Sequence, residues 1–293
     1  MSATKRFHVL IATDGSTSAR AAMTAVIRLP WPAGSQGSAV VATHVRSDYR
    51  SSILPTALDQ TSELTARSAS RALKKRWPDG GARIVEASPV DAILTEARRV
   101  RADVIVMGWR GHGPVRRLLA GSVSRGVVRG ASCAVLVVRR PIRELRHVVV
   151  GVDGSDHAER ALKFVAGLEP SRGARATVFR AVDIMHPPAH WLAPAAARGT
   201  VAGEVSRINE RQRTAARKDL SRAAKILSSA GWSVDQVVTD GAPLRELLAT
   251  VSNAGADLLV VGARGVAGLR HLLLGSVAEG ALNRSPVPVL VVR

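Results

Sequence analysis

Short apolar runs alternate along the chain with longer segments in which apolar residues recur at helical spacing. Residues 7–12 and 148–152 are apolar at almost every position, which is typical of strands buried on both faces of a sheet. Eight further runs of this kind lie at residues 40–45, 84–85, 104–107, 135–138, 176–182, 234–238, 258–261 and 289–292. The pattern predicts five strands in each half of the chain.

The segments between these strands predict helices. Ala19, Ala22 and Val26 share one face of a helix that follows the first strand, and further helices are expected around residues 59–77 and 204–230. Five repetitions of strand and helix indicate the α/β class. We expect each half to form a doubly wound, Rossmann-like parallel sheet with strand order 3-2-1-4-5 and helices on both faces.

The two halves of the chain are copies of each other. Residues 102–139 align without a gap with residues 256–293 and match at almost half of their positions. The segments that begin at His8 and His147 match as well. A repeat of this length predicts two domains of the same fold.

The boundary between the copies lies near Pro141, because proline cannot continue a central strand. We therefore expect one domain at residues 1–141 and a second at residues 142–293. The second copy is longer between its matching segments, which predicts an insertion within residues 184–217. Within it, residues 191–197 are expected to form irregular loop.

Two polar loops in each copy follow strands whose carboxyl ends meet at one edge of the predicted sheet, where doubly wound folds bind ligands. The first loop carries Asp14 or Asp153 directly after strand one. The second loop, after strand four, has the pattern G-x2-G-x9-G-S. Its members are Gly108, Gly111, Gly121 and Ser122 in the first copy and Gly262, Gly265, Gly275 and Ser276 in the second.

The second loop has the properties of a phosphate cradle. Glycines let backbone amides approach an anion, and the helix that begins at the Gly-Ser pair directs its amides and dipole toward it. The Ser122 hydroxyl can add a hydrogen bond or cap the helix, and Arg110 and Arg264 add positive charge. The aspartates suit ribose hydroxyls or the adenine edge, because a carboxylate accepts hydrogen bonds but repels phosphate. Both residue types also build plain turns and caps, which is the structural alternative.

The motif, with its aspartate and in two copies, resembles that of the universal stress protein family, and more narrowly its tandem ATP-binding type. The resemblance covers residues 6–139 and 146–293. It implies ATP or a related adenine nucleotide, with or without Mg²⁺, at two sites per chain, and a role in regulating stress survival or growth. It also implies an adenine contact at Val45, with Ala181 as the counterpart in the second copy.

The resemblance carries two further expectations. Val123 and Ser124 would continue the run of amides beside the phosphates, whereas the second copy has Val277 and Ala278 and so lacks one hydroxyl. Members of the family pair their fifth strands across a two-fold axis. The fifth strands of the two copies are therefore expected to pair within this chain as a pseudo-dimer, and a homodimer of the whole chain is a second arrangement.

The chain is strongly basic, with 42 Lys and Arg against 23 Asp and Glu and a net charge of +19. This balance favours a polyanionic partner. Aromatic residues make up only 3% of the chain, too few for a base-stacking platform. The basic stripe of Arg67, Arg71, Lys74 and Lys75 is interpreted as a solvated helix face. A nucleic-acid-binding stress protein is therefore an alternative, but not the favoured one.

Other classes of function find less support. A single cysteine, Cys133, excludes an intrachain disulfide, and no apolar run approaches the roughly 18 residues of a membrane span. We expect a cytoplasmic protein without membrane contact. The chain has neither a Gly-Lys phosphate loop nor a G-x-S-x-G elbow nor a metal-binding motif. Binding is thus favoured over catalysis, and a weak ATPase or autophosphorylating enzyme is the alternative.

Overall fold

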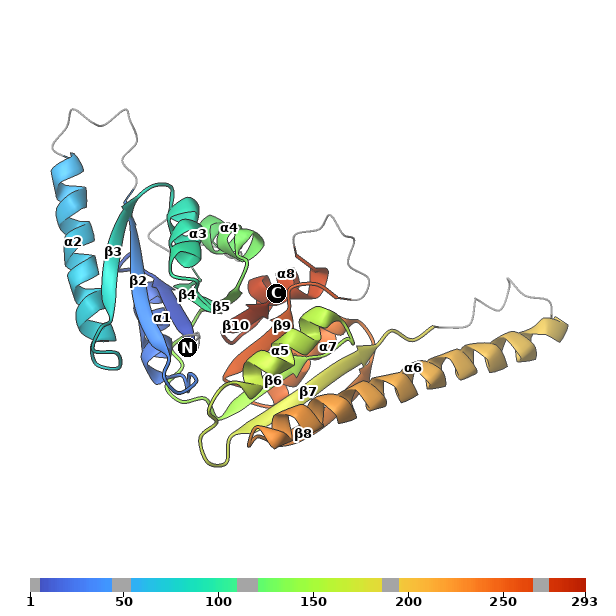
Figure 1. Ribbon diagram of the computed structural model, residues 1–293. Coiled ribbons are helices and arrows are strands. Elements are labelled where there is room, and N and C mark those ends of the chain that lie inside the picture. The colour runs from blue at the N-terminus through green and yellow to red at the C-terminus, as the bar shows by residue number, and fades with distance from the viewer. Residues whose placement is uncertain (1–5, 44–53, 110–120, 186–194, 266–273) are drawn as a thin grey trace.

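The computed structural model describes residues 6–43, 54–109, 121–185, 195–265 and 274–293, and strands and helices alternate within each half of the chain (Figure 1). The first half contains β1 (His8–Ala12), α1 (Thr17–Arg28), β2 (Gln36–Thr43), α2 (Leu54–Leu73), β3 (Gly81–Glu86), α3 (Pro89–Arg99), β4 (Val104–Gly108), α4 (Ser122–Gly130) and β5 (Ala134–Val138). The second half contains β6 (His147–Gly151), α5 (Asp156–Ala166), β7 (Arg175–Val182), α6 (Ala195–Ser229), β8 (Ser233–Asp240), α7 (Pro243–Asn253), β9 (Leu258–Gly262), α8 (Ser276–Arg284) and β10 (Val289–Val292).

All of these strands belong to one ten-stranded sheet, in the order β3-β2-β1-β4-β5-β10-β9-β6-β7-β8. Within each half the strands are parallel and follow the predicted order 3-2-1-4-5. β5 and β10 pair antiparallel, with Leu136 opposite Leu290. The two five-stranded sheets expected from the sequence are therefore joined into one, through the intrachain pairing of fifth strands that was expected.

Helices cover both faces of this sheet (Figure 1). α1, α2, α5 and α6 pack on one face, and α3, α4, α7 and α8 pack on the other. All five residues of β1 are buried, and the neighbours Leu10 and Ile11 enter the cores on opposite faces. Burying one such side chain contributes about 1.5–3 kcal/mol. This double burial explains why the strands are continuous apolar runs in the sequence.

β2 begins at Gln36, earlier than the apolar run that starts at residue 40. A Cβ on Gly37 would lie 2.2 Å from the ring of Trp77, so this glycine leaves room for the indole. Gln36 and Ser38 hold the ring of the buried His8 through contacts of 3.0 and 2.8 Å. The start of β2 is thus shaped by tertiary contacts of small and polar residues, which the apolar pattern does not reveal.

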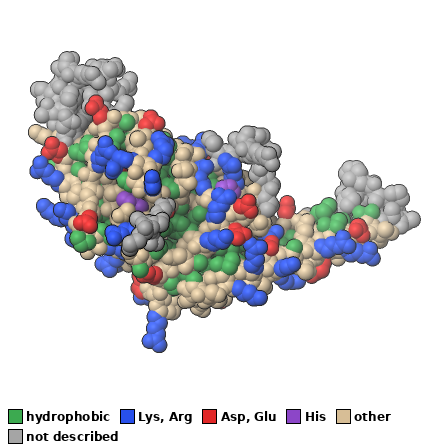
Figure 2. Space-filling view, viewed as in Figure 1, with side chains coloured by type: hydrophobic (Ala, Val, Ile, Leu, Met, Phe, Trp, Pro, Cys, Tyr) green, Lys and Arg blue, Asp and Glu red, His purple; other side chains and the backbone are tan. Residues whose placement is uncertain are grey.

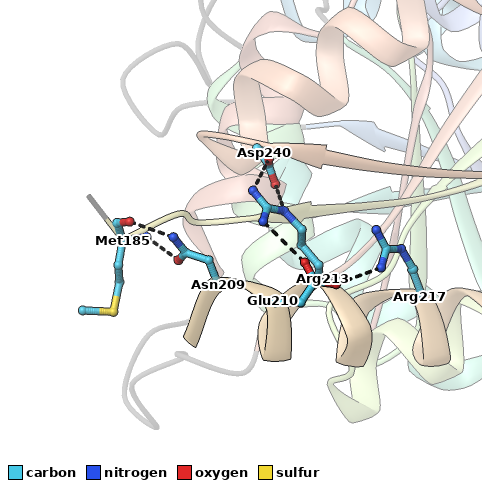
Figure 3. A network of polar contacts seen from close by, with 6 residues as sticks. All are labelled: Met185, Asn209, Glu210, Arg213, Arg217 and Asp240. Atoms are coloured by element: carbon cyan, nitrogen blue, oxygen red, sulfur yellow. Dashed lines mark hydrogen bonds and ion pairs between the residues drawn. The ribbon is translucent and has the colours of Figure 1, made fainter. Parts of the chain in front are cut away.

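Helix α6 has 35 residues and extends beyond the sheet, as the long orange helix in Figure 1 shows. It begins at Ala195, so the expectation of irregular loop at residues 195–197 was wrong. The side chain of Asn209 bonds the main-chain N–H and C=O of Met185, each at 2.9 Å, and Arg213 pairs with Asp240 at 2.8 Å (Figure 3). These polar contacts tie α6 to the ends of β7 and β8.

The outer surface agrees with the interpretation of the basic stripe. On α2 the side chains of Ala66, Ala69 and Leu73 are buried against the sheet. The stripe of Arg67, Arg71, Lys74 and Lys75 is exposed. Lys and Arg side chains are spread over the face seen in Figure 2. Within the described ranges, no helix combines the length and the apolar character that crossing a membrane requires.

Candidate functional site

Asp14 and Asp153 follow the first strand of their halves and begin tight turns. In each turn Oδ1 accepts a hydrogen bond of 3.0 Å from the amide two residues on, that of Ser16 or Ser155. In each turn a glycine lies between the aspartate and the serine. Gly15 has a φ of +76° and Gly154 a φ of +85°, a left-handed conformation that favours glycine. One carboxylate oxygen of each aspartate therefore has the turn-forming role that the sequence left open.

Helices α4 and α8 begin without a side-chain cap. Their N-cap residues are Gly121 and Gly275, which carry no side-chain acceptor. Ser122 and Ser276 are the first helical residues, so Ser122 does not cap α4 as the sequence allowed. The first-turn amides of a helix have no partner inside it, and the dipole adds positive charge there. Helices α1 and α5, in contrast, are capped by serine side chains.

The residue that follows the fourth strand is hydrogen-bonded to the N-cap residue of the next helix in both halves. The carbonyl of Trp109 accepts a bond of 3.1 Å from the amide of Gly121. In the second half the carbonyl of Ala263 accepts a bond of 2.8 Å from the amide of Gly275. The amides of Trp109 and Ala263 in turn bond the last strand of their half, at 2.9 and 2.7 Å. Arg110 and Gly111, two predicted site residues, lie outside the described residues.

Gly108 and Gly262 have a packing role that the sequence did not show. A Cβ on Gly108 would lie 2.5 Å from Oγ of Ser18 and 2.9 Å from the amide nitrogen of Ala19. A Cβ on Gly262 would lie 2.8 Å from the carbonyl carbon of His157. Both glycines thus let the first turn of α1 or α5 approach the end of a strand. Their missing side chains face these helices, and the predicted ribose and phosphate contacts would have to come from their backbone.

The two loops of the second half converge on Asp153. A Cβ on Gly265 would lie 2.5 Å from Oδ2 of Asp153, so the strand-four loop touches this carboxylate. Oγ of Ser155 donates to the carbonyl of Arg264 at 3.2 Å. A Cβ on Gly275 would lie 3.4 Å from Cα of Arg264. The structure therefore brings four predicted residues, Asp153, Arg264, Gly265 and Gly275, to the start of α8.

Ser124 is used inside the protein. Its hydroxyl is buried and donates to the carbonyls of Trp109 and Gly121, at 3.2 and 3.0 Å. The hydroxyl joins Trp109 and Gly121 to the first turn of α4, whereas Ala278 offers no such bond in the second half. The two copies therefore differ in how the residue after strand four is bonded to the helix, and the ligand contact of this hydroxyl stays a prediction. Val123 and Val277 are half-buried beside the two helix starts.

The predicted pairing of Val45 with Ala181 was wrong. β7 pairs with β6 in the register in which β2 pairs with β1. Counting along the strands, Ala181 corresponds to Ala42, and the position of Val45 corresponds to Ile184. Residues 40–45 read VVATHV and residues 179–184 read FRAVDI, so one identity, Ala42 with Ala181, is too little to fix the alignment from the sequence. Val45 itself lies outside the described residues, and Ile184 follows β7 and is half-buried.

Several basic side chains near these loops were missed by sequence reasoning. The guanidinium of Arg139 lies 3.8 Å from the centre of the Trp109 ring. In the second half burial lowers the pKa of His157, and the neighbouring Arg160 and Arg264 act in the same direction. The sequence held one signal for Arg139, because both copies end in Val-Val-Arg. In the described part of the chain, no three His, Cys, Asp or Glu side chains are grouped to hold a metal ion.

Comparison with known proteins identifies one family. The profile of the universal stress protein family matches residues 5–139 and 144–293. A universal stress protein of Mycobacterium tuberculosis H37Rv is 30% identical over 225 residues, which is 72% of this chain and 68% of the relative. The crystal structure of a universal stress protein from Archaeoglobus fulgidus has a TM-score of 0.67 at 18% identity, over 98% of this chain and 96% of that one. A functionally unknown protein from Pseudomonas aeruginosa PAO1 has a TM-score of 0.60 at 17% identity, over 97% and 92%.

Proposed function

The chain belongs to the universal stress protein family, and we propose that it binds one ATP in each half and regulates stress survival or growth in response to the nucleotide. The two halves would be domains of residues 1–141 and 142–293, each with a site at the carboxyl edge of its strands. The proposal includes a cytoplasmic location. This location is consistent with the family and with the absence of a membrane-spanning helix among the described residues.

The observation that carries this proposal is the convergence at the start of α8. Oδ2 of Asp153 lies against the Gly265 position, and Gly275 and Ser276 begin an uncapped helix next to it. A carboxylate accepts hydrogen bonds from hydroxyl groups but repels phosphate, whereas the amides at a helix start attract phosphate. One ligand that suits both the carboxylate and the helix start is a nucleotide whose ribose lies at Asp153 and whose phosphates lie at α8.

The same division of roles is proposed for each residue of the two sites. In the second site Arg264, Gly265, Gly275 and Val277 would surround the phosphates, and Ile184 would face the base. In the first site these roles would fall to Arg110, Gly111, Gly121, Val123 and the amide of Ser124, with Asp14 at the ribose and Val45 at the base. Any Mg²⁺ would be bound mainly by the phosphates, because among the described residues no three His, Cys, Asp or Glu side chains are grouped to hold a metal ion.

We propose binding rather than turnover as the role of these sites. The polar groups that recur in both halves are backbone amides, the exposed serines of the two helix starts, the aspartates, and the arginines Arg110 and Arg264. One oxygen of each aspartate already accepts a turn amide. Amides and a carboxylate so engaged suit recognition of a ribose and its phosphates. The release of labelled phosphate from ATP should therefore stay at the rate in buffer, and release lost in Asp153→Ala would contradict this part of the proposal.

The test is calorimetric titration of ATP into Ser276→Glu, with Ser276→Gln as the matched control. A carboxylate about 5 Å from a phosphate, at an effective dielectric constant of about 20, is repelled by about 3 kcal/mol, a loss of affinity of about 10²-fold. The glutamate also stabilises the start of α8 itself by about 0.3–1 kcal/mol, so the variant should fold. Glutamine has the same size and should bind ATP nearly as wild type does.

Ser122→Glu and Ser122→Gln form the corresponding pair for the first site. Each glutamate variant should retain one ATP per chain, and the double variant should retain none. Equal affinity of Ser276→Glu and Ser276→Gln for ATP would contradict a phosphate site at α8, and wild type that takes up no ATP at millimolar concentration would refute the proposed function.

A further inference from the structure

Arg139 belongs to one half of the chain and contacts a helix of the other. It follows β5, and its guanidinium stacks on Trp109, at the start of the strand-four loop. Nη2 of the same side chain donates at 2.5 Å to the carbonyl of Leu282, near the C-terminal end of α8. A single side chain therefore joins the loop of the first candidate site to the helix that begins at the second.

Arg293 makes the reciprocal connection. It follows β10, as Arg139 follows β5, and its Nη2 donates to the carbonyls of Val128 and Arg129 at 2.7 and 2.6 Å. These carbonyls lie in the last turn of α4. Burial lowers the pKa of Arg293, and the nearby Arg264 of the second site acts in the same direction. The carbonyl of Val292, the residue before Arg293, accepts the amide of Ala263 in the second site's loop at 2.7 Å, so Arg293 lies between the second candidate site and the helix that begins at the first.

Helices α4 and α8 are short, so a charge at one end of either helix lies close to its other end. Each has 9 residues, so its ends are about 13 Å apart. A cation at the C-terminal end satisfies free carbonyls and complements the dipole, and an anion at the N-terminal end does the same for the amides. Each helix therefore begins at the candidate site of its own half and ends on an arginine from beside the other site.

We propose that Arg139 and Arg293 are positioning residues that couple the two nucleotide sites. Each arginine would hold the helix of the opposite site in place from the loop region of its own site, so that binding at one site changes the affinity of the other. The inference rests on the proposed function, because it concerns the regulation of those same two sites.

The connection through Arg139 is the stronger one. Trp109 lies under its guanidinium, and the carbonyl of Trp109 also accepts bonds from Gly121 and Ser124. The loop, the start of α4 and Arg139 are therefore held together at one residue. The second half has Ala263 at the corresponding place and so has no ring there for Arg293 to stack on. Removing Arg139 should consequently disturb the coupling more than removing Arg293.

The first measurement is the affinity of the second site for ATP in a Ser122→Glu background, where the first site is blocked. Arg139→Gln should weaken this binding roughly two- to five-fold, the effect of one charge at a helix end. Arg139→Lys keeps the charge and should recover part of the loss. Arg140→Gln is the matched control, because Nη2 of Arg140 also crosses between the halves, but to the carbonyl of Ala256, which precedes β9 and is not part of α8. It should leave the affinity unchanged.

The second measurement asks whether the signal reaches the first site, which a purely structural role of Arg139 would not produce. In the Ser122→Glu background, binding of ATP at the second site should change the fluorescence of Trp109. The Trp109 signal is obtained by subtracting the fluorescence of a Trp109→Phe variant. The change should vanish in Arg139→Gln and persist in Arg140→Gln. Binding of ATP with no change at Trp109, or equal losses of affinity in both glutamine variants, would overturn this inference alone. No binding of ATP to wild type would overturn the proposed function and the inference with it.

Discussion

Replacement of Gly262 by alanine separates packing from ligand binding as the reason for a glycine at the end of β9. The added Cβ would lie 2.8 Å from the carbonyl carbon of His157 and 2.9 Å from the amide nitrogen of Ala158. Both are backbone atoms of the first turn of α5, so neither can rotate away as a side chain would. The helix start must move away from the sheet to admit the methyl group.

The cost of this movement can be worked out from the contacts. Overpacking of a well-packed site costs about 1–3 kcal/mol. Alanine also restricts the unfolded chain more than glycine does, which returns about 0.4–1 kcal/mol. We therefore expect Gly262→Ala to lower the free energy of unfolding by about 1–2 kcal/mol, with no ligand present.

The assay is urea unfolding of the free protein followed by circular dichroism. Gly151→Ala serves as the control, because the nearest atom to its added Cβ would be Cγ1 of Val261 at 3.5 Å, an ordinary contact. Gly151→Ala should unfold close to wild type and Gly262→Ala clearly earlier. Equal midpoints for the two variants would refute the packing argument and return Gly262 to a role in ligand contact alone.

Three further predictions concern other parts of the molecule. Desolvation raises the pKa of the half-buried Cys133 thiol to about 11, so iodoacetamide should label it much more slowly in the native protein than after unfolding, and equally rapid labelling of both would contradict the raised pKa. Burial lowers the pKa of His8 from its ordinary value of 6.5, so the unfolded chain binds more protons and stability should fall as the pH drops below 6.5; a slope that His8→Gln leaves unchanged would disprove this. Asn209→Ala removes both hydrogen bonds to the main chain of Met185, so hydrogen exchange at the Met185 amide should become faster. Unaltered exchange would show that these two hydrogen bonds do not protect the amide.

Much of the fold could be predicted because its strands are buried on both faces. A strand such as β1 has no polar side and therefore reads as a plain apolar run. The repeat then assigns the same topology twice. The start of β2 could not be found this way. A glycine is needed at position 37 because the indole of Trp77, distant in sequence, leaves no room for a side chain there. The start of α6 escaped for another reason, because residues 195–203 read AAARGTVAG, with two glycines and no large apolar residues at helical spacing.

The candidate site was predictable in outline and not in its contacts. The sequence shows which residues recur after the first and fourth strands, and the structure brings Asp153, Gly265 and Gly275 together as expected. The direction of a missing side chain cannot be seen in a sequence, so the packing role of Gly108 was hidden. The same holds for the Ser124 hydroxyl, which bonds the protein itself. Arg139 contacts a helix of the other half. The neighbouring sequence does not indicate this contact, apart from the Val-Val-Arg ending that both copies share.

The central claim is that the uncapped starts of α4 and α8 hold the phosphates of ATP, and amide NMR shifts test it most directly. Addition of ATP should move the amide signals of the first turns of these two helices, at Ser122–Ser124 and at residues 276–278. The first turns of α1 and α5, whose amides are capped by Ser16 and Ser155, should change much less. Shifts confined to α1 and α5, or no shifts at saturating ATP, would contradict the account.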